Sequence, residues 1–146
     1  MEQRLQNVLI PKNSVSFKVQ LNDSWRREYG EFVTVFGLYY RRATIALLFK
    51  ADGNLDGTIT GSWWAWMSSS LTDREGEFKK ISDIATFDSE HEFEIGHDDD
   101  EIFIIEKKSP IAVRQAFDFT DPGDATSFVT PDFKFRPMWN VKVKLL

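Results

Sequence analysis

The sequence predicts an all-β protein, a single antiparallel β-sandwich, and three observations carry that prediction. Apolar and polar residues alternate over many short segments, as in half-buried strands, whose side chains point to opposite faces in turn. Turn residues such as Gly, Pro, Asn and Asp separate these segments every 8–12 residues or so. No stretch has a convincing helical period. A jelly-roll or immunoglobulin-like sandwich fits this pattern, and a closed β-barrel is the alternative.

The length and composition predict one folded domain. The chain has 146 residues, enough to enclose a hydrophobic core, and we expect a single all-β domain over residues 1–146. Residues 1–14 are expected to form an N-terminal arm. Hydrophobic residues make up 42% of the sequence and include 13 Phe and 5 Trp, which argues against disorder.

The clearest predicted element is a hairpin over residues 44–67. Its first strand collects large apolar side chains on one face. The turn over residues 52–57 is rich in Gly, Asn and Asp, which tolerate positive φ. In the return strand Trp64 and Trp66 share one face, and Trp63 lies on the other.

The remaining strands follow from the same alternation. Residues 15–21 alternate cleanly, whereas residues 32–40 are apolar on both faces, as expected of a central strand that is covered from both sides. Loops are expected over residues 68–80, with one short helical turn as an option, and over residues 120–132. After the hairpin, strands are expected over residues 84–87, 91–95, 101–106, 113–119, 133–135 and 139–145.

The composition argues against several classes of protein. The chain has no Cys, which excludes disulfide scaffolds, thiol nucleophiles and cysteine-based zinc sites. The net charge is −5 and no basic stretch is present, so nucleic acid is not an expected partner. The first residues resemble neither a signal peptide nor a membrane span. We therefore expect a soluble protein that is made in the cytoplasm and has no membrane partner.

No residues stand out as catalytic. His91 and His97 are the only histidines, and the sequence lacks the G-x-S-x-G motif of a serine nucleophile. The acidic residues of segment 90–94 alternate with His91 and Phe93, so we expect them to line the solvent face of a strand. The sequence therefore predicts a protein that is not an enzyme and needs no cofactor.

Two acidic turns are candidate metal sites, and we expect neither to bind metal. The turn after residue 51 resembles a calcium loop of the EF-hand type, with Asp52, Asn54 and Asp56 at positions 1, 3 and 5. Position 12 of that motif requires a bidentate Glu, and here it is Trp63. The second turn, over residues 97–101, is acidic but has no recognisable ligand spacing.

Four aromatic residues are the candidate binding residues: Trp64, Trp66, Tyr39 and Tyr40. Large aromatic side chains concentrate binding energy at protein interfaces, and their faces stack on sugar rings. They are equally common in protein cores. The sequence leaves these three roles open.

The leading hypothesis is a non-enzymatic β-sandwich that serves as a structural or adaptor subunit of a larger assembly, such as a virion or tail-like particle. Its partners would be other protein subunits in a homo- or hetero-oligomer. The first alternative is a lectin-like carbohydrate-binding module that uses exposed Trp residues. The second is a small β-barrel that binds an apolar ligand in an open interior.

Overall fold

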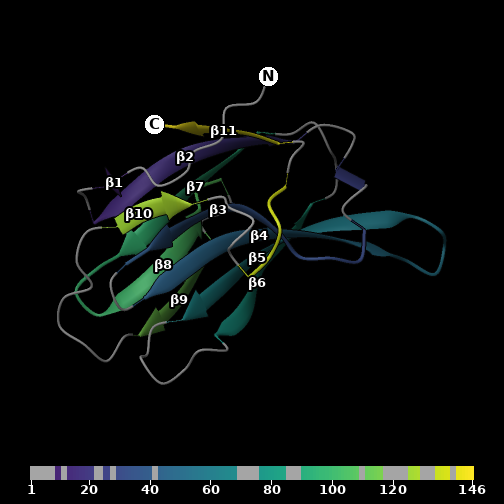
Figure 1. The fold of residues 1–146 in the computed structure, drawn as a ribbon. Helices are drawn as coiled ribbons and strands as arrows, with labels where there is room; N and C mark the ends of the chain where they lie inside the picture. Colours follow the sequence, from purple (N-terminus) through teal and green to yellow (C-terminus); the bar gives the residue numbers. More distant parts are fainter. Residues whose placement is uncertain are drawn as a thin grey trace.

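The computed structural model describes residues 9–10, 13–21, 25–26, 29–40, 43–68, 76–84, 90–108, 111–116, 125–128, 134–138 and 141–146. These residues form two antiparallel sheets that pack face to face (Figure 1). Their strands are β1 (Leu9–Ile10), β2 (Ser14–Leu21), β3 (Val33–Tyr39), β4 (Thr44–Gly53), β5 (Ile59–Ser68), β6 (Glu77–Ile84), β7 (Glu90–His97), β8 (Glu101–Glu106), β9 (Ile111–Ala116), β10 (Ala125–Phe128) and β11 (Val141–Leu145).

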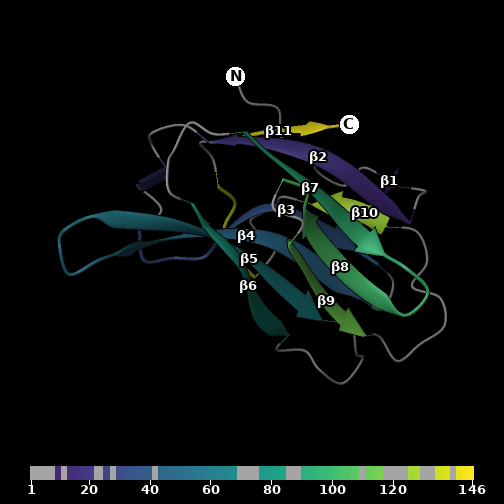
Figure 2. The same cartoon turned by 180° about the vertical axis from the view of Figure 1, so that it is seen from behind.

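The strand order confirms the predicted β-sandwich. One sheet has six strands in the order β1-β10-β3-β4-β5-β6, and the other has five in the order β11-β2-β7-β8-β9. Figure 2 shows the five-stranded sheet in front of the six-stranded one. The alternative of a closed barrel is wrong, because the strands divide into two separate sheets. No helix in the described part of the chain is long and apolar enough to cross a membrane.

Large apolar side chains fill the space between the sheets. The largest fully buried ones are Trp63, Phe17, Phe36, Phe49 and Phe93. The Phe17 ring from the five-stranded sheet lies 4.6 Å, centroid to centroid, from that of Phe36 in the six-stranded sheet. This packed interior does not match the open interior that an apolar-ligand barrel requires.

The six-stranded sheet also carries a smaller apolar cluster on its outer face. Ala46, Leu48 and Trp66 are buried there, on the side of the sheet that faces away from the main core. Strand β3 is buried at every position except its last residue. The prediction of a central strand covered from both sides is therefore confirmed.

Several segment boundaries differ from those expected. Strand β6 occupies residues 77–84, where a loop up to residue 80 was expected, and β10 lies within the expected loop over residues 120–132. Neither segment alternates clearly in sequence, and each is held by pairing with a neighbouring strand. Strand β1 forms within the expected arm. Of the expected strand 113–119, residues 113–116 lie in β9, which begins at residue 111, and the rest lie outside the described residues.

The expected strands near the C-terminus are only partly described. Phe135 lies in a bend, and the neighbouring Pro137 makes an isolated bridge to Thr34. The final strand, β11, pairs with β2 at the edge of the five-stranded sheet. Residues 133, 139 and 140 lie outside the described residues.

The β4–β5 hairpin extends beyond its neighbouring strands. Its last pairs with them are Phe49 to β3 and Gly61 to β6, apart from an isolated bridge between Tyr29 and Ala51. The rest of the hairpin projects from the body of the sandwich (Figure 1). The turn is ordered by its own side chains, because the Asp56 carboxylate accepts hydrogen bonds from both the backbone N–H and the hydroxyl of Thr58.

Candidate functional site

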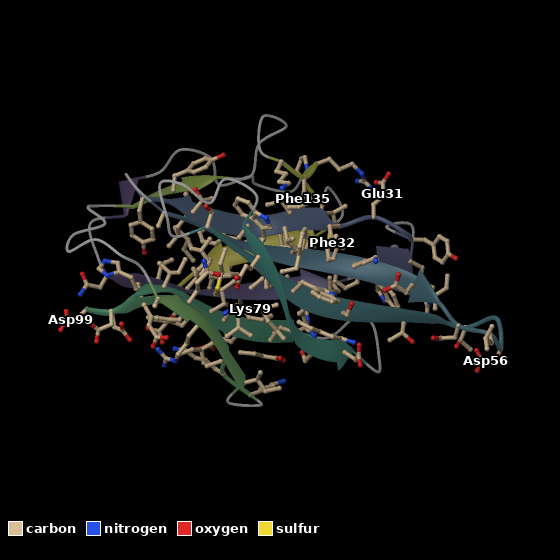
Figure 3. The ribbon with its side chains drawn as sticks, turned by 90° about the horizontal axis from the view of Figure 1, so that it is seen from below. Glu31, Phe32, Asp56, Lys79, Asp99 and Phe135 are labelled. Atoms are coloured by element: carbon tan, nitrogen blue, oxygen red, sulfur yellow. The ribbon has the colours of Figure 1, made fainter. Side chains whose placement is uncertain are left out.

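The outer face of the six-stranded sheet collects five aromatic side chains, which we call the aromatic patch. They come from the segment before β3, from β5, from β6 and from the segment after β10, and they are Phe32, Trp64, Trp66, Phe78 and Phe135. Figure 3 shows Phe32 and Phe135 close together, although about a hundred residues separate them in sequence.

The rings of the patch contact one another with the geometry of aromatic clusters. Phe32 stacks on Phe78 at a centroid distance of 4.7 Å and meets the edge of Trp64 at 5.4 Å. Phe135 in turn lies 5.6 Å from Phe78. Such pairs contribute about 0.5–1.5 kcal/mol each beyond their buried area. Trp66 is 6% exposed and Phe78 is 43% exposed, so the patch has a packed side and an open side.

A β-bulge decides which residues of β6 join this face. The pairing of β5 with β6 shifts between Trp63 and Trp64, so that Trp63 lies opposite Ser82 but Trp64 lies opposite Lys80. The extra residue, Ile81, is buried. The shift places Lys80 beside Trp64 on the outer face, with its ammonium 5.9 Å from the centroid of the indole ring.

A short chain of hydrogen bonds fixes the orientation of Trp64. Its indole Nε1 donates to Ser62 Oγ at 2.8 Å, and that hydroxyl donates to the Lys50 carbonyl at 3.2 Å. The indole is therefore oriented before any ligand arrives. It is also half-buried, so part of its surface contacts solvent.

A polar pocket of about 270 Å³ adjoins Trp64 at the base of the projecting hairpin. It is lined by Asp52, Asn54, Thr60, Ser62, Lys80 and Asp83, from β4, the turn after it, β5 and β6. Ser62 and Lys80 both line the pocket and approach Trp64, so the patch and the pocket are continuous. We call the two together the outer-face site.

The structure brings two of the four predicted binding residues into this site. Trp64 and Trp66 belong to the aromatic patch, although Trp66 is largely covered: a Cβ at Gly76 would overlap its indole. Tyr39 is partly exposed at the end of β3, and no aromatic contact joins it to the patch among those described. Tyr40 packs in the main core edge-on to His97, and burial raises the pKa of its hydroxyl.

Sequence reasoning missed most of the site. Phe32 and Phe135 contact Trp64 and Trp66 only through the fold, and Phe78 lies in a segment that was expected to be a loop. The pocket residues were not predicted as a site, because they fell in or beside an expected turn, an expected strand and an expected loop. The polar side chains that precede Trp64 on the same face of β5 were the available signal, since Thr60, Ser62 and Trp64 are spaced two residues apart.

The two acidic turns do not gather metal ligands in the structure. Asp98 Oδ1 accepts hydrogen bonds from the N–H groups of Asp100 and Glu101, and these bonds lower the pKa of Asp98. In the described part of the chain, no three His, Asp or Glu side chains converge as a metal site would require. That neither turn binds metal stays a prediction.

A polar group also lies between the sheets. His91 Nδ1 is 3.4 Å from Glu106 Oε1, and the Ser82 hydroxyl donates to Glu106 Oε2 at 2.8 Å. This group links β7 and β8 of one sheet to β6 of the other. Burial lowers the pKa of His91, an effect that the hydrogen bond with Glu106 offsets in part. The lowered pKa favours the neutral imidazole at pH 7, in which the contact with Glu106 is a hydrogen bond.

We expect the stability of the protein to depend on pH through His91. Because its pKa is below the ordinary 6.5, the unfolded chain binds a proton below pH 6.5 that the folded chain does not bind. The free energy of unfolding should therefore fall as the pH drops from 7 through this range, as measured by urea denaturation at a series of pH values.

The test variant is His91→Gln, which should flatten the pH dependence just below 6.5. The carboxylates with lowered pKa values, Asp56 and Asp98, lose their contribution only below about pH 3.8 and do not interfere. An unchanged slope in His91→Gln would contradict this assignment.

Comparison with known proteins supports the fold alone. The chain matches no protein-family model, and no curated protein matches its sequence. The solved structure of alginate lyase Aly36B is similar over 97% of this chain and 75% of its own, with a TM-score of 0.52 and 11% sequence identity. At that identity the similarity shows a shared β-sandwich and assigns no residue a role.

Proposed function

We propose that the protein is a non-catalytic carbohydrate-binding β-sandwich and that the outer-face site holds the saccharide. One observation carries the proposal: the oriented, partly exposed Trp64 ring adjoins a pocket lined entirely by polar side chains. A sugar ring has an apolar face and a rim of hydroxyl groups, so it needs this combination of an aromatic surface and hydrogen-bonding groups.

The likeness to an alginate lyase agrees with this ligand class. We extend to this chain only the class of ligand, a carbohydrate, and not the lyase reaction of that protein. The two pocket carboxylates are engaged by lysines: Asp83 by Lys80 at 2.8 Å and Asp52 by Lys50 at 3.5 Å. Carboxylates held in this way suit the positioning of a ligand rather than proton transfer.

The test is a glycan array followed by titration calorimetry with the glycans that bind. Trp64→Ala should weaken binding at least tenfold, because the stacking surface is lost. The matched control is Glu90→Gln, in a pocket on the outer face of the five-stranded sheet, and it should bind normally. An array without hits, or a Trp64→Ala variant with unchanged affinity, would rule the function out.

The second candidate function is a subunit of a larger assembly. The observation that favours it is Phe78, a large aromatic side chain that is exposed at the open side of the patch. No comparison supports this role. Sedimentation velocity separates the two candidates, because an assembly subunit should self-associate or co-sediment with a partner, and Phe78→Ala should abolish that association.

A further inference from the structure

We propose that the outer-face site selects a neutral saccharide and discriminates against uronic acids such as those of alginate. This inference rests on the proposed carbohydrate site and names its ligand class. It follows from the charges and the hydrogen-bonding groups that line the polar pocket.

The pocket presents no uncompensated positive charge among the described residues. Its lining contains two carboxylates, Asp52 and Asp83, and one ammonium group, that of Lys80. Lys80 lies 2.8 Å from Asp83, which neutralises it. The nearby Lys50 lies 3.5 Å from Asp52. A uronate would therefore meet a surface whose cations are already paired, so it would gain no new ion pair there.

The lining is also rich in hydrogen-bond acceptors. The Asn54 amide nitrogen donates to the hydroxyls of Thr58 and Thr60. The amide oxygen is therefore the group that can accept a hydrogen bond from a ligand. Together with the oxygens of Asp52 and Asp83, this makes a set of acceptors. The matching ligand supplies donors, and the adjacent hydroxyl groups of a neutral sugar do so.

The size of the pocket indicates which part of the saccharide lies in the pocket and which part lies on Trp64. At about 270 Å³ it is just below the range of about 300–1,000 Å³ that is typical of sites for drug-sized ligands. It therefore holds one sugar ring by its hydroxyl groups, and the next ring of the chain stacks on Trp64 at the rim.

The test compares sugars that differ only at carbon 6. Calorimetry on the full chain uses β-1,4-mannotetraose against tetramannuronate and α-1,4-galactotetraose against tetragalacturonate, alongside an array of neutral and acidic glycans. We expect a neutral sugar to bind at least tenfold more tightly than its uronate counterpart. We also expect Asp83→Asn to reduce that ratio and the control Glu90→Gln to leave it unchanged.

Each outcome decides one point. Tighter binding of a uronate than of its neutral counterpart would overturn the inference and leave the carbohydrate site standing. An array without any hit would overturn both. The surface pair between Lys80 and Asp83 contributes little to stability, so Asp83→Asn should fold, and an unchanged melting temperature would confirm that its binding reports on the pocket.

Discussion

Replacing Trp63 with alanine is expected to remove about 3–5 kcal/mol from the free energy of unfolding. The indole is wholly buried between the sheets, where Phe49, Phe93 and His91 meet it edge-on at 5.1 to 5.2 Å. The free energy of unfolding of a domain of this kind is about 5–15 kcal/mol in total, so the variant should be close to unfolding. Urea denaturation followed by circular dichroism measures the loss.

The adjacent residue supplies the control for Trp63. Trp64 follows it in β5 but lies half-buried on the opposite face, so Trp64→Ala should cost only about 1–2 kcal/mol. The indole N–H of Trp63 has no hydrogen-bond partner among the described residues, which places the expected loss near the lower end of its range. Equal losses for the two variants would show that the faces are assigned wrongly.

Trp66→Ala is expected to lower the free energy of unfolding by about 3 kcal/mol, near the low end for the loss of a large buried aromatic side chain. Trp66 packs on the outer face against Phe135, and the Lys134 ammonium lies 5.3 Å from the centroid of its ring. It is nearly as buried as a core residue, but its cluster is small and open on one side. Thermal denaturation of the variant should show a clear drop in melting temperature.

Two further variants separate stability from binding at the patch. Trp66→Phe keeps an aromatic ring and should recover much of the lost stability. Phe78→Ala removes the most exposed ring of the patch and should lower the melting temperature less than Trp66→Ala does. If Trp66→Ala were as stable as the parent, Trp66 would be a surface ring, and its role as a binding residue would become the simpler interpretation.

The sequence was sufficient for the fold wherever alternation is strong. The hairpin expected over residues 44–67 is β4 and β5, and the predicted separation of Trp63 from Trp64 and Trp66 is confirmed, because Trp63 belongs to the main core and the other two to the outer cluster. The same holds for β2, where Phe17, Val19 and Leu21 are buried. Period-two patterns of this kind specify which face is buried without reference to the rest of the chain.

Strands held mainly by their neighbours could not be predicted. In β6 charged residues surround Phe78, and this segment becomes a strand because β5 offers it an unpaired edge. The candidate site could not be predicted from the sequence for the same reason. The position of Lys80 beside Trp64 depends on the bulge at Ile81, and a shift of one residue in pairing is not encoded in any local pattern.

The order of pairing in the two sheets has a consequence for the rate of folding. Strands β3 to β6 are hydrogen-bonded in chain order, so this meander forms through closure of short loops. The five-stranded sheet requires β2 to meet β7, and the hydrogen bond from Ser14 to Glu94 spans 80 residues. Closing so long a loop costs more entropy and slows folding. Strands β3 to β6 therefore have the shortest route to pairing, and the long-range pairs of both sheets, β2 with β7 and β3 with β10, determine how fast the whole sandwich closes.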